Sequence, residues 1–130
     1  MIVVDASLVV DVMISADGGA ALGAQLEARG GALLAPEILD LEVLQALRRH
    51  VRRGAIDDIR AQAGLRILLE LNIERFSHAG LTDRIWALRE NLTAYDGAYI
   101  ALAEALDAPL WTRDAKLAGI PGVTASVEVL

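Results

Sequence analysis

Short apolar runs rich in β-branched residues alternate with longer amphipathic stretches along this chain. The short runs have the length and composition of buried strands, and the longer stretches have the apolar spacing of helices. Strands are predicted at residues 2–5, 32–35, 73–76 and 110–112, with a further edge strand within 123–130. Helices are predicted at residues 7–15, 17–29, 36–53, 56–71, 80–91, 94–107 and 113–118.

Cap and breaker residues mark several ends of these helices. Asp17 and Thr93 have side chains that accept hydrogen bonds from backbone amides, so both suit helix N-caps. Pro36 suits the first turn of a helix because its fixed φ is already helical. The pair Gly30 and Gly31, and later Gly54, are expected to stop the helices that precede them.

Strands that alternate with helices predict an α/β fold with a mostly parallel sheet of about five strands and helices on both faces. The strands are apolar throughout, as expected for a sheet that is covered on both sides. The length of 130 residues and a hydrophobic content of 55% suit one domain over residues 1–130. No apolar stretch approaches the roughly 18 residues of a membrane span. The first residues lack a basic leader, so we expect a cytoplasmic protein.

Composition narrows the chemistry that a site in this chain could carry. The chain has no cysteine and two histidines, which excludes disulfides and a thiolate zinc site. A bound metal would therefore be held mainly by oxygen, which favours Mg²⁺ or Mn²⁺. The net charge of −6 argues against a passive nucleic-acid-binding protein. It does not exclude a nuclease, because bound cations offset a cluster of carboxylates.

Three carboxylates are predicted at the edge of the sheet where its strands end. Asp5 ends the first strand, and Asp114 lies two residues beyond the strand at 110–112. Asp96 lies in the first turn of a helix that begins at the same edge if the crossovers are right-handed. Ligands of open α/β sheets bind at this edge. Each acid also has a simpler interpretation, as a turn residue for Asp5 and as a helix N-terminal residue for the other two.

Glu42 interrupts the apolar face of its predicted helix. On a helical wheel it falls between Ile38 and Ala46, with Val43 beside it, and no Lys or Arg lies one turn away on that face. A buried carboxylate without a partner is costly, so a metal ion is a natural partner, although a backbone amide could serve instead. Two carboxylates about 5 Å apart repel by roughly 3 kcal/mol at an effective dielectric of about 20, which bound cations would relieve.

At these residues the chain resembles the PIN-domain family and, within it, the VapC toxins. The opening VVDASLVV is similar to the family's first strand with its leading acid, Asp5. The segment APEILDLEVLQALRR resembles the part of the family that carries its glutamate, here Glu42. The segment LTAYDGAYIALAEALDAPLWTRDAKLA is similar to the part with the third and fourth acids, Asp96 and Asp114. The resemblance extends over nearly the whole chain in the same order.

The resemblance implies a three-layer α/β/α PIN-like fold and a bacterial or archaeal endoribonuclease that uses one or two Mg²⁺ ions, or Mn²⁺, to cut tRNA or ribosomal RNA. It also implies a homodimer and inhibition by a VapB-type antitoxin. Asp5, Glu42, Asp96 and Asp114 would be its catalytic, metal-binding residues. Ser7 and Thr112 match polar positions that support the metal site, although each could merely cap a helix. Gln45 departs from the asparagine that relatives often carry three residues after the glutamate.

Basic residues cluster at the end of the helix that carries Glu42. Arg49 and Arg53 fall near the direction of Glu42, about 10 and 16 Å along the helix axis. They could contact RNA phosphates or an acidic antitoxin segment, or simply suit a helix C-terminus. The four aromatic residues in apolar patterns are interpreted as core or dimer interface: Trp86, Tyr95, Tyr99 and Trp111.

Three alternative functions remain open from the sequence. A receiver-like signalling domain has an acidic Mg²⁺ pocket, but it would need paired acids near the first strand and a lysine after a late strand. Here Asp5 stands alone, and Lys116 lies beyond Asp114. A catalytically silent PIN domain that binds only a partner would keep the fold. A DNA-directed nuclease would need DNA-gripping elements for which the chain has little room.

Overall fold

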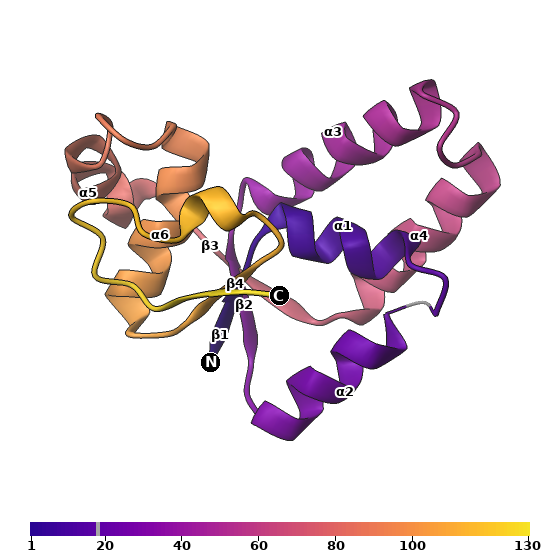
Figure 1. Ribbon diagram of the computed structural model, residues 1–130, viewed down its shortest axis with the longest axis horizontal. Helices are drawn as coiled ribbons and strands as arrows, with labels where there is room; N and C mark the ends of the chain where they lie inside the picture. Colours follow the sequence, from indigo (N-terminus) through magenta and orange to yellow (C-terminus); the bar gives the residue numbers. More distant parts are fainter. Residues whose placement is uncertain (18) are drawn as a thin grey trace.

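A five-stranded sheet forms the centre of the computed structural model, which describes residues 1–17 and 19–130 (Figure 1). The strand order is β3-β2-β1-β4-β5, and all four pairs of neighbouring strands are parallel. The predicted α/β class and the parallel five-stranded sheet are therefore confirmed. The strands are β1 (Ile2–Val4), β2 (Leu33–Pro36), β3 (Ile73–Phe76), β4 (Leu110–Thr112) and β5 (Val127–Val129).

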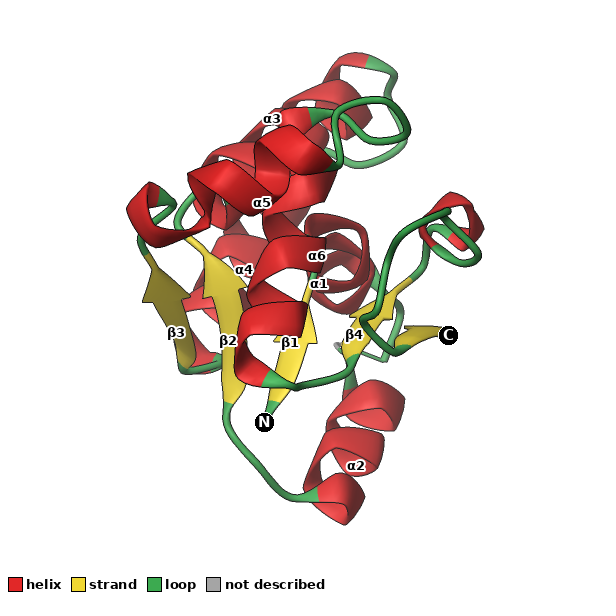
Figure 2. Ribbon diagram, turned by 90° about the vertical axis from the view of Figure 1, so that its left-hand side faces the viewer, coloured by secondary structure: helices red, strands yellow, loops and turns green. Residues whose placement is uncertain are grey.

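In the described part of the chain, six α-helices and two short 3-10 turns surround the sheet. They are α1 (Ala6–Ile14), α2 (Ala20–Arg29), α3 (Leu39–Arg52), α4 (Asp58–Glu70), η1 (Ala79–Leu81), α5 (Thr82–Ala87), α6 (Ala94–Leu106) and η2 (Ala115–Leu117). Helix α6 packs on β1 and β2 (Figure 2), and α1 packs against α3 and α4 (Figure 1). None of the helices in residues 1–17 and 19–130 is long and apolar enough to cross a membrane.

Side-chain caps start three of the helices. Asp5 accepts from the amide of Leu8, Asp57 from the amide of Arg60, and Thr93 from the amide of Asp96. Each satisfies an amide in the first turn that has no partner within the helix. The cap predicted at Thr93 is confirmed. Asp5 is thus both the residue after β1 and the N-cap of α1, which places its carboxylate at the strand end.

Two predicted helix starts are wrong. Pro36 ends β2 instead of beginning a helix, and α3 begins at Leu39. A proline is tolerated at a strand end because the missing N–H leaves few ladder bonds unmade. The second helix begins at Ala20, one turn later than the cap predicted at Asp17. The Asp17 carboxylate still accepts from the amides of Gly19 and Ala21.

Two of the later predicted helices are shorter than expected. Residues 80–91 form η1 and then α5, which ends at Ala87 because the amide of Leu88 bonds to both Arg84 and Ile85 carbonyls. This tightening breaks the α-helical ladder although no Gly or Pro stands there. Residues 113–118 contain only the single 3-10 turn η2. The edge strand predicted within 123–130 is confirmed as β5, beside β4.

The buried side chains of β1, α1 and α6 form the middle of the core. The largest fully buried side chains include Trp111, Tyr99, Leu8 and Met13. Burying such side chains contributes roughly 1.5–3 kcal/mol each and holds the helices on the sheet. Gly64 lets α4 approach α1 closely, since a Cβ there would lie 3.2 Å from the Met13 carbonyl oxygen. The rigid core therefore fixes the edge where β1 and β4 end.

Candidate functional site

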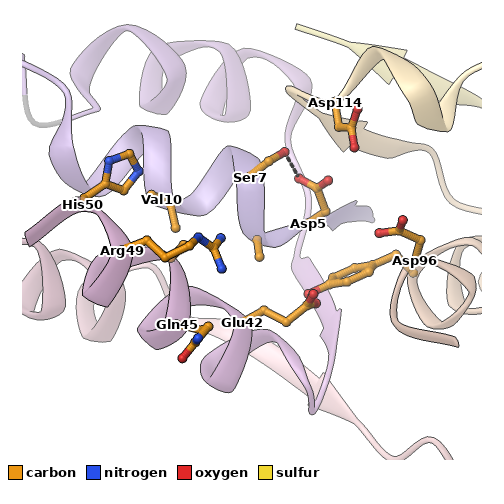
Figure 3. Close-up of a pocket in the computed structure, with 12 residues that line it drawn as sticks. Asp5, Ser7, Val10, Glu42, Gln45, Arg49, His50, Asp96 and Asp114 are labelled. Carbon is orange, nitrogen blue, oxygen red and sulfur yellow. Dashed lines mark hydrogen bonds between the residues drawn. The ribbon is translucent and has the colours of Figure 1, made fainter. Parts of the chain in front are cut away.

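A pocket of about 470 Å³ opens at the carboxyl edge of β1, between α1, α3 and α6 (Figure 3). All four acids singled out in the sequence line it. Each comes from a different element: Asp5 caps α1, Glu42 and Asp96 lie in the first turns of α3 and α6, and Asp114 caps η2. The convergence that the sequence predicted is therefore present.

Asp5 is the most buried of these acids, with 5% of its surface exposed. Its carboxylate accepts hydrogen bonds from the Ser7 hydroxyl at 2.7 Å, from the Leu8 amide at 3.0 Å and from the Thr112 hydroxyl. Burial raises the pKa of Asp5, while the three hydrogen bonds act in the opposite direction. These partners fix the carboxylate in one orientation at the floor of the pocket.

Thr112 and Ser7 occupy the supporting positions that the resemblance implied. The fully buried Thr112 hydroxyl donates to Asp5 and accepts from the Asp114 amide at 2.9 Å. The Ser7 hydroxyl donates to Asp5 and accepts from the Arg113 amide at 3.1 Å. The two hydroxyls thus connect the end of β1 with the segment after β4. They hold Asp5 and Asp114 at a fixed relative position.

Asp96 and Asp114 lie on the opposite side of the pocket from α3. Asp114 accepts from the Lys116 amide at 3.0 Å and so starts η2. Burial raises the pKa of Asp96, and the negative charges of Asp114 and Asp5 raise it further. The carboxylates are therefore near enough to repel one another, because like charges disfavour ionisation. Figure 3 shows Asp5, Asp96 and Asp114 directed toward a common space.

Glu42 has a partner that the sequence analysis missed. The Tyr99 hydroxyl donates to Glu42 Oε1 at 2.7 Å. Burial raises the pKa of Glu42, and the charges of Asp96 and Asp5 add to this effect. Burial and the neighbouring carboxylate also raise the pKa of Tyr99 far above its ordinary value, so the phenol stays a neutral donor. A signal existed in the sequence, since Tyr99 lies three residues after Asp96 and so on the same helix face.

The aromatic residues divide into two groups. Trp111 and Tyr99 are buried, which confirms the core interpretation for both. Trp86 and Tyr95 are 68% and 58% exposed, so they lie outside the core, and their place in a dimer interface stays a prediction. The exposed pair lies beside a separate apolar pocket between α5 and α6.

Of the two arginines predicted to contact RNA or an antitoxin, one lines the pocket. Arg49, Gln45 and His50 line it from α3, and Figure 3 shows the Arg49 guanidinium turned toward the acids. Arg53 is the exposed C-cap residue of α3 and is not among the residues that line this pocket. The four-residue step between them spans about 6 Å along the helix, which moves Arg53 beyond the opening.

The donor set suits a hard divalent cation, since carboxylate oxygens dominate the pocket. Among residues 1–17 and 19–130, no three acidic or histidine side chains converge closely enough to chelate one ion as they stand. The oxygens of Asp5 and Glu42 accept hydrogen bonds from the hydroxyls of Thr112 and Tyr99, respectively. The role of these carboxylates as metal ligands stays a prediction.

Comparison with known proteins gives consistent matches over almost the full chain. The PIN domain family model matches residues 2–123. Ribonuclease VapC1 of Mycobacterium tuberculosis is 40% identical over 129 residues, which cover 98% of this chain and 96% of that protein.

Solved structures show the same fold. PAE2754 from Pyrobaculum aerophilum superposes with a TM-score of 0.74 at 21% identity, over 98% of this chain and 83% of that one. A chain of a toxin–antitoxin complex from Klebsiella pneumoniae superposes with a TM-score of 0.67 at 21% identity, over 96% and 97% of the two chains. At these identities the two structures support the architecture alone.

Proposed function

This chain belongs to the PIN-domain family and to its VapC ribonucleases, and on that basis we propose that it is a Mg²⁺-dependent endoribonuclease that cuts tRNA or ribosomal RNA. The observation that carries the proposal is the group of four carboxylates around one pocket at the sheet edge. These carboxylates repel one another, so the binding of a divalent cation among them is energetically favourable. Mn²⁺ has similar ligand preferences and is expected to substitute.

Asp5, Glu42, Asp96 and Asp114 are the proposed ligands, for one or two ions. When bound, Mg²⁺ supplies Lewis acidity that activates water for attack on phosphorus and offsets charge on the phosphate. Ser7 and Thr112 hold Asp5 and Asp114 in place through the hydrogen bonds described above. A carboxylate that faces the attacking water can accept its proton.

Arg49 is the proposed contact for a substrate phosphate next to the scissile bond. Its guanidinium lines the acidic pocket and offers a planar set of donors that matches phosphate oxygens. A cation at the pocket also counters the repulsion between RNA and a chain with a net charge of −6. Arg53 lies outside the pocket, so we expect it to contribute little to this contact.

We further propose that the protein forms a homodimer and that a VapB-type antitoxin inhibits it. Support comes from its family and from the toxin–antitoxin complex of Klebsiella pneumoniae with the same fold. Co-expression with the neighbouring gene product, followed by light scattering, tests both statements. The expected results are a complex without ribonuclease activity and, for the free protein, twice the 13.8 kDa mass of one chain. Ribonuclease activity of the complex would contradict inhibition by the antitoxin, and a monomeric mass of the free protein would contradict the homodimer.

Cleavage of purified total tRNA and ribosomal RNA tests the ribonuclease proposal. Antitoxin-free protein is incubated with RNA and Mg²⁺, with RNA and a chelator, and with Mn²⁺ in place of Mg²⁺. Discrete fragments with either cation and none with the chelator are expected. Fragments that persist in the chelator would overturn metal dependence. Intact RNA under all conditions, together with retained Mg²⁺ binding, would instead favour a catalytically silent PIN domain.

A further inference from the structure

The hydrogen bond between Tyr99 and Glu42 joins the two helices that face each other across the acidic pocket. Tyr99 belongs to α6 and Glu42 to α3, and the hydroxyl lies 2.7 Å from Glu42 Oε1. The Tyr99 ring is buried, with 2% of its surface exposed, so its packing leaves the hydroxyl little freedom to move. The glutamate side chain has three rotatable bonds and is otherwise only half-buried. The rigid side chain of Tyr99 therefore fixes the flexible side chain of Glu42.

The chemistry of this donor suits a carboxylate that must later hold a cation. A phenol is neutral, so it orients the carboxylate without cancelling its charge, as an arginine or lysine would. A carboxylate has two oxygens and about four lone-pair sites, and Tyr99 occupies one of them at Oε1. Capacity remains at Oε2 and at Oε1 itself. Glu42 is thus held in place yet keeps the charge and the oxygens that a cation needs.

The position of Tyr99 on α6 ties this arrangement to the rest of the pocket. Asp96 and Tyr99 lie three residues apart, so both side chains leave the same face of α6. That face contributes one carboxylate of its own through Asp96, and through the tyrosine hydroxyl it fixes a second carboxylate on α3.

We propose that Tyr99 is a positioning residue that orients Glu42 for divalent-cation binding. The inference rests on the proposed function, because it assumes that Glu42 is a metal ligand. Hydrogen bonds of this kind to ligating carboxylates typically change metal affinity by 10–100-fold. Tyr99 touches neither the cation nor the substrate in this arrangement, and its effect passes through Glu42 alone.

Calorimetric titration with Mg²⁺ in the absence of RNA tests the proposal. Tyr99→Phe keeps the buried ring and removes the hydroxyl, and the expected result is a Kd for Mg²⁺ at least 10-fold higher than that of the wild type. Tyr95→Phe is the matched control, because Tyr95 lies on the same helix with its side chain 58% exposed, and it should bind Mg²⁺ like the wild type. A Kd for Tyr99→Phe within twofold of the wild-type value would overturn the inference.

A double-mutant cycle separates positioning from a general effect on folding. Glu42→Gln lowers Mg²⁺ affinity directly, and adding Tyr99→Phe should cause no further loss, because the tyrosine acts only through the carboxylate. Independent, additive losses would assign Tyr99 a merely structural role. RNA cleavage gives a second indication, since excess Mg²⁺ should restore the rate of Tyr99→Phe but not repair a misfolded protein.

Fluorotyrosine labelling of the wild-type protein tests the proposal even if Tyr99→Phe folds poorly. The chain has only two tyrosines, so ¹⁹F NMR gives two resonances, which Tyr95→Phe assigns. Mg²⁺ should shift the Tyr99 resonance and leave the Tyr95 resonance unchanged; an unmoved Tyr99 resonance at saturating Mg²⁺ would contradict the inference. Absence of Mg²⁺ binding by the wild type would refute the proposed function itself, whereas normal binding by Tyr99→Phe refutes only the role of Tyr99.

Discussion

The Thr112 hydroxyl donates a hydrogen bond to the carboxylate of Asp5, a residue 107 positions away in the sequence. The two residues follow and end the neighbouring strands β1 and β4, which pair in parallel through Val3 and Val4. Thr112 also accepts a hydrogen bond from the Asp114 amide. One buried hydroxyl therefore contacts the carboxylate of Asp5 and the backbone of Asp114, which are two of the four acids. The pairing of β1 with β4 therefore fixes the positions of Asp5 and Asp114 in the acidic pocket.

Replacing Thr112 by valine should lower both stability and Mg²⁺ affinity. The change keeps the shape of the side chain but leaves a buried carboxylate oxygen and the Asp114 amide without a partner, at a cost of about 1–3 kcal/mol. Ser7→Ala should cost less, because Ser7 is only half-buried and water can replace its hydroxyl. Urea unfolding and Mg²⁺ titration measure the two effects. Equal losses in both variants would argue against a special role for the buried hydroxyl.

The acidic pocket should destabilise the protein when no cation is bound. Burial and neighbouring charges raise the pKa of Asp96, so relieving the charge with Asp96→Asn should stabilise the metal-free protein by about 1 kcal/mol, or roughly 3–6 °C in Tm. Mg²⁺ should raise the Tm of the wild type and raise that of the variant less. Differential scanning calorimetry with and without Mg²⁺ measures this, and a metal-free variant that melts below the wild type would contradict it.

The raised pKa values of three acids in the pocket determine how the stability of the metal-free protein changes with pH. Asp5, Glu42 and Asp96 each have a pKa raised above the unfolded value, so the folded state binds more protons between the two values. Their contribution to stability in the absence of metal therefore decreases as pH rises through that window. Mg²⁺ should abolish this decrease, because the cation favours the ionised carboxylates.

The contribution of Glu104 to stability should change with pH in the opposite direction. Its hydrogen bonds with Arg84, at 2.6 and 3.0 Å, lower its pKa, and the Thr124 amide adds to the effect. The stability that this pair contributes is present above the ordinary pKa of a glutamate and is lost as pH falls through the lowered value. At neutral pH, Glu104→Gln should cost about 1–2 kcal/mol, a value reduced by solvent at Arg84, whose side chain is 38% exposed.

Glu128→Gln is the matched control for that change. Glu128 pairs with Arg29 at the surface, where the arginine side chain is 54% exposed, so its loss should cost less than about 1 kcal/mol. Urea unfolding at neutral and acidic pH distinguishes the two. The difference between Glu104→Gln and wild type should shrink at low pH, and a difference independent of pH would contradict the assigned ion pair.

Arg49→Ala should weaken RNA binding and reduce its dependence on salt. Losing one phosphate contact lowers the slope of log affinity against log salt by about 0.7–0.9. Arg53→Ala on the same helix is the control, because Arg53 lies outside the residues that line the pocket. Fluorescence anisotropy with labelled RNA in the chelator measures binding without cleavage. The same slope in wild type and Arg49→Ala would remove Arg49 from the path of the RNA.

The sequence predicted those features that depend on local pattern and on the rules of parallel sheets. Asp5 and Asp114 follow strands, and parallel strands bring their carboxyl ends to one edge, so their convergence could be inferred without coordinates. Glu42 could be identified because it interrupts an apolar helix face. The cap at Thr93 could be identified because a hydroxyl there meets free amides at a helix start.

Features that depend on tertiary contacts could not be predicted. The position of Tyr99 three residues after Asp96 indicates that it shares a helix face with that acid, but only the fold shows that its hydroxyl reaches Glu42. Trp86 was assigned to core or interface because periodicity indicates an apolar face but not whether a neighbour covers it. The end of α5 at Ala87 carries no breaker residue, and it coincides with the shared hydrogen bonds of the Leu88 amide.

Cleavage of RNA by Asp96→Asn at saturating Mg²⁺ tests the assignment of the active site most directly. Asp83→Asn is the matched control, because Asp83 also lies in the first turn of a helix but is exposed and outside the acidic pocket. We expect Asp96→Asn to lose at least 100-fold in cleavage rate while remaining folded, and Asp83→Asn to match the wild type. Cleavage by Asp96→Asn at the wild-type rate would show that the four acids around this pocket are not the catalytic centre.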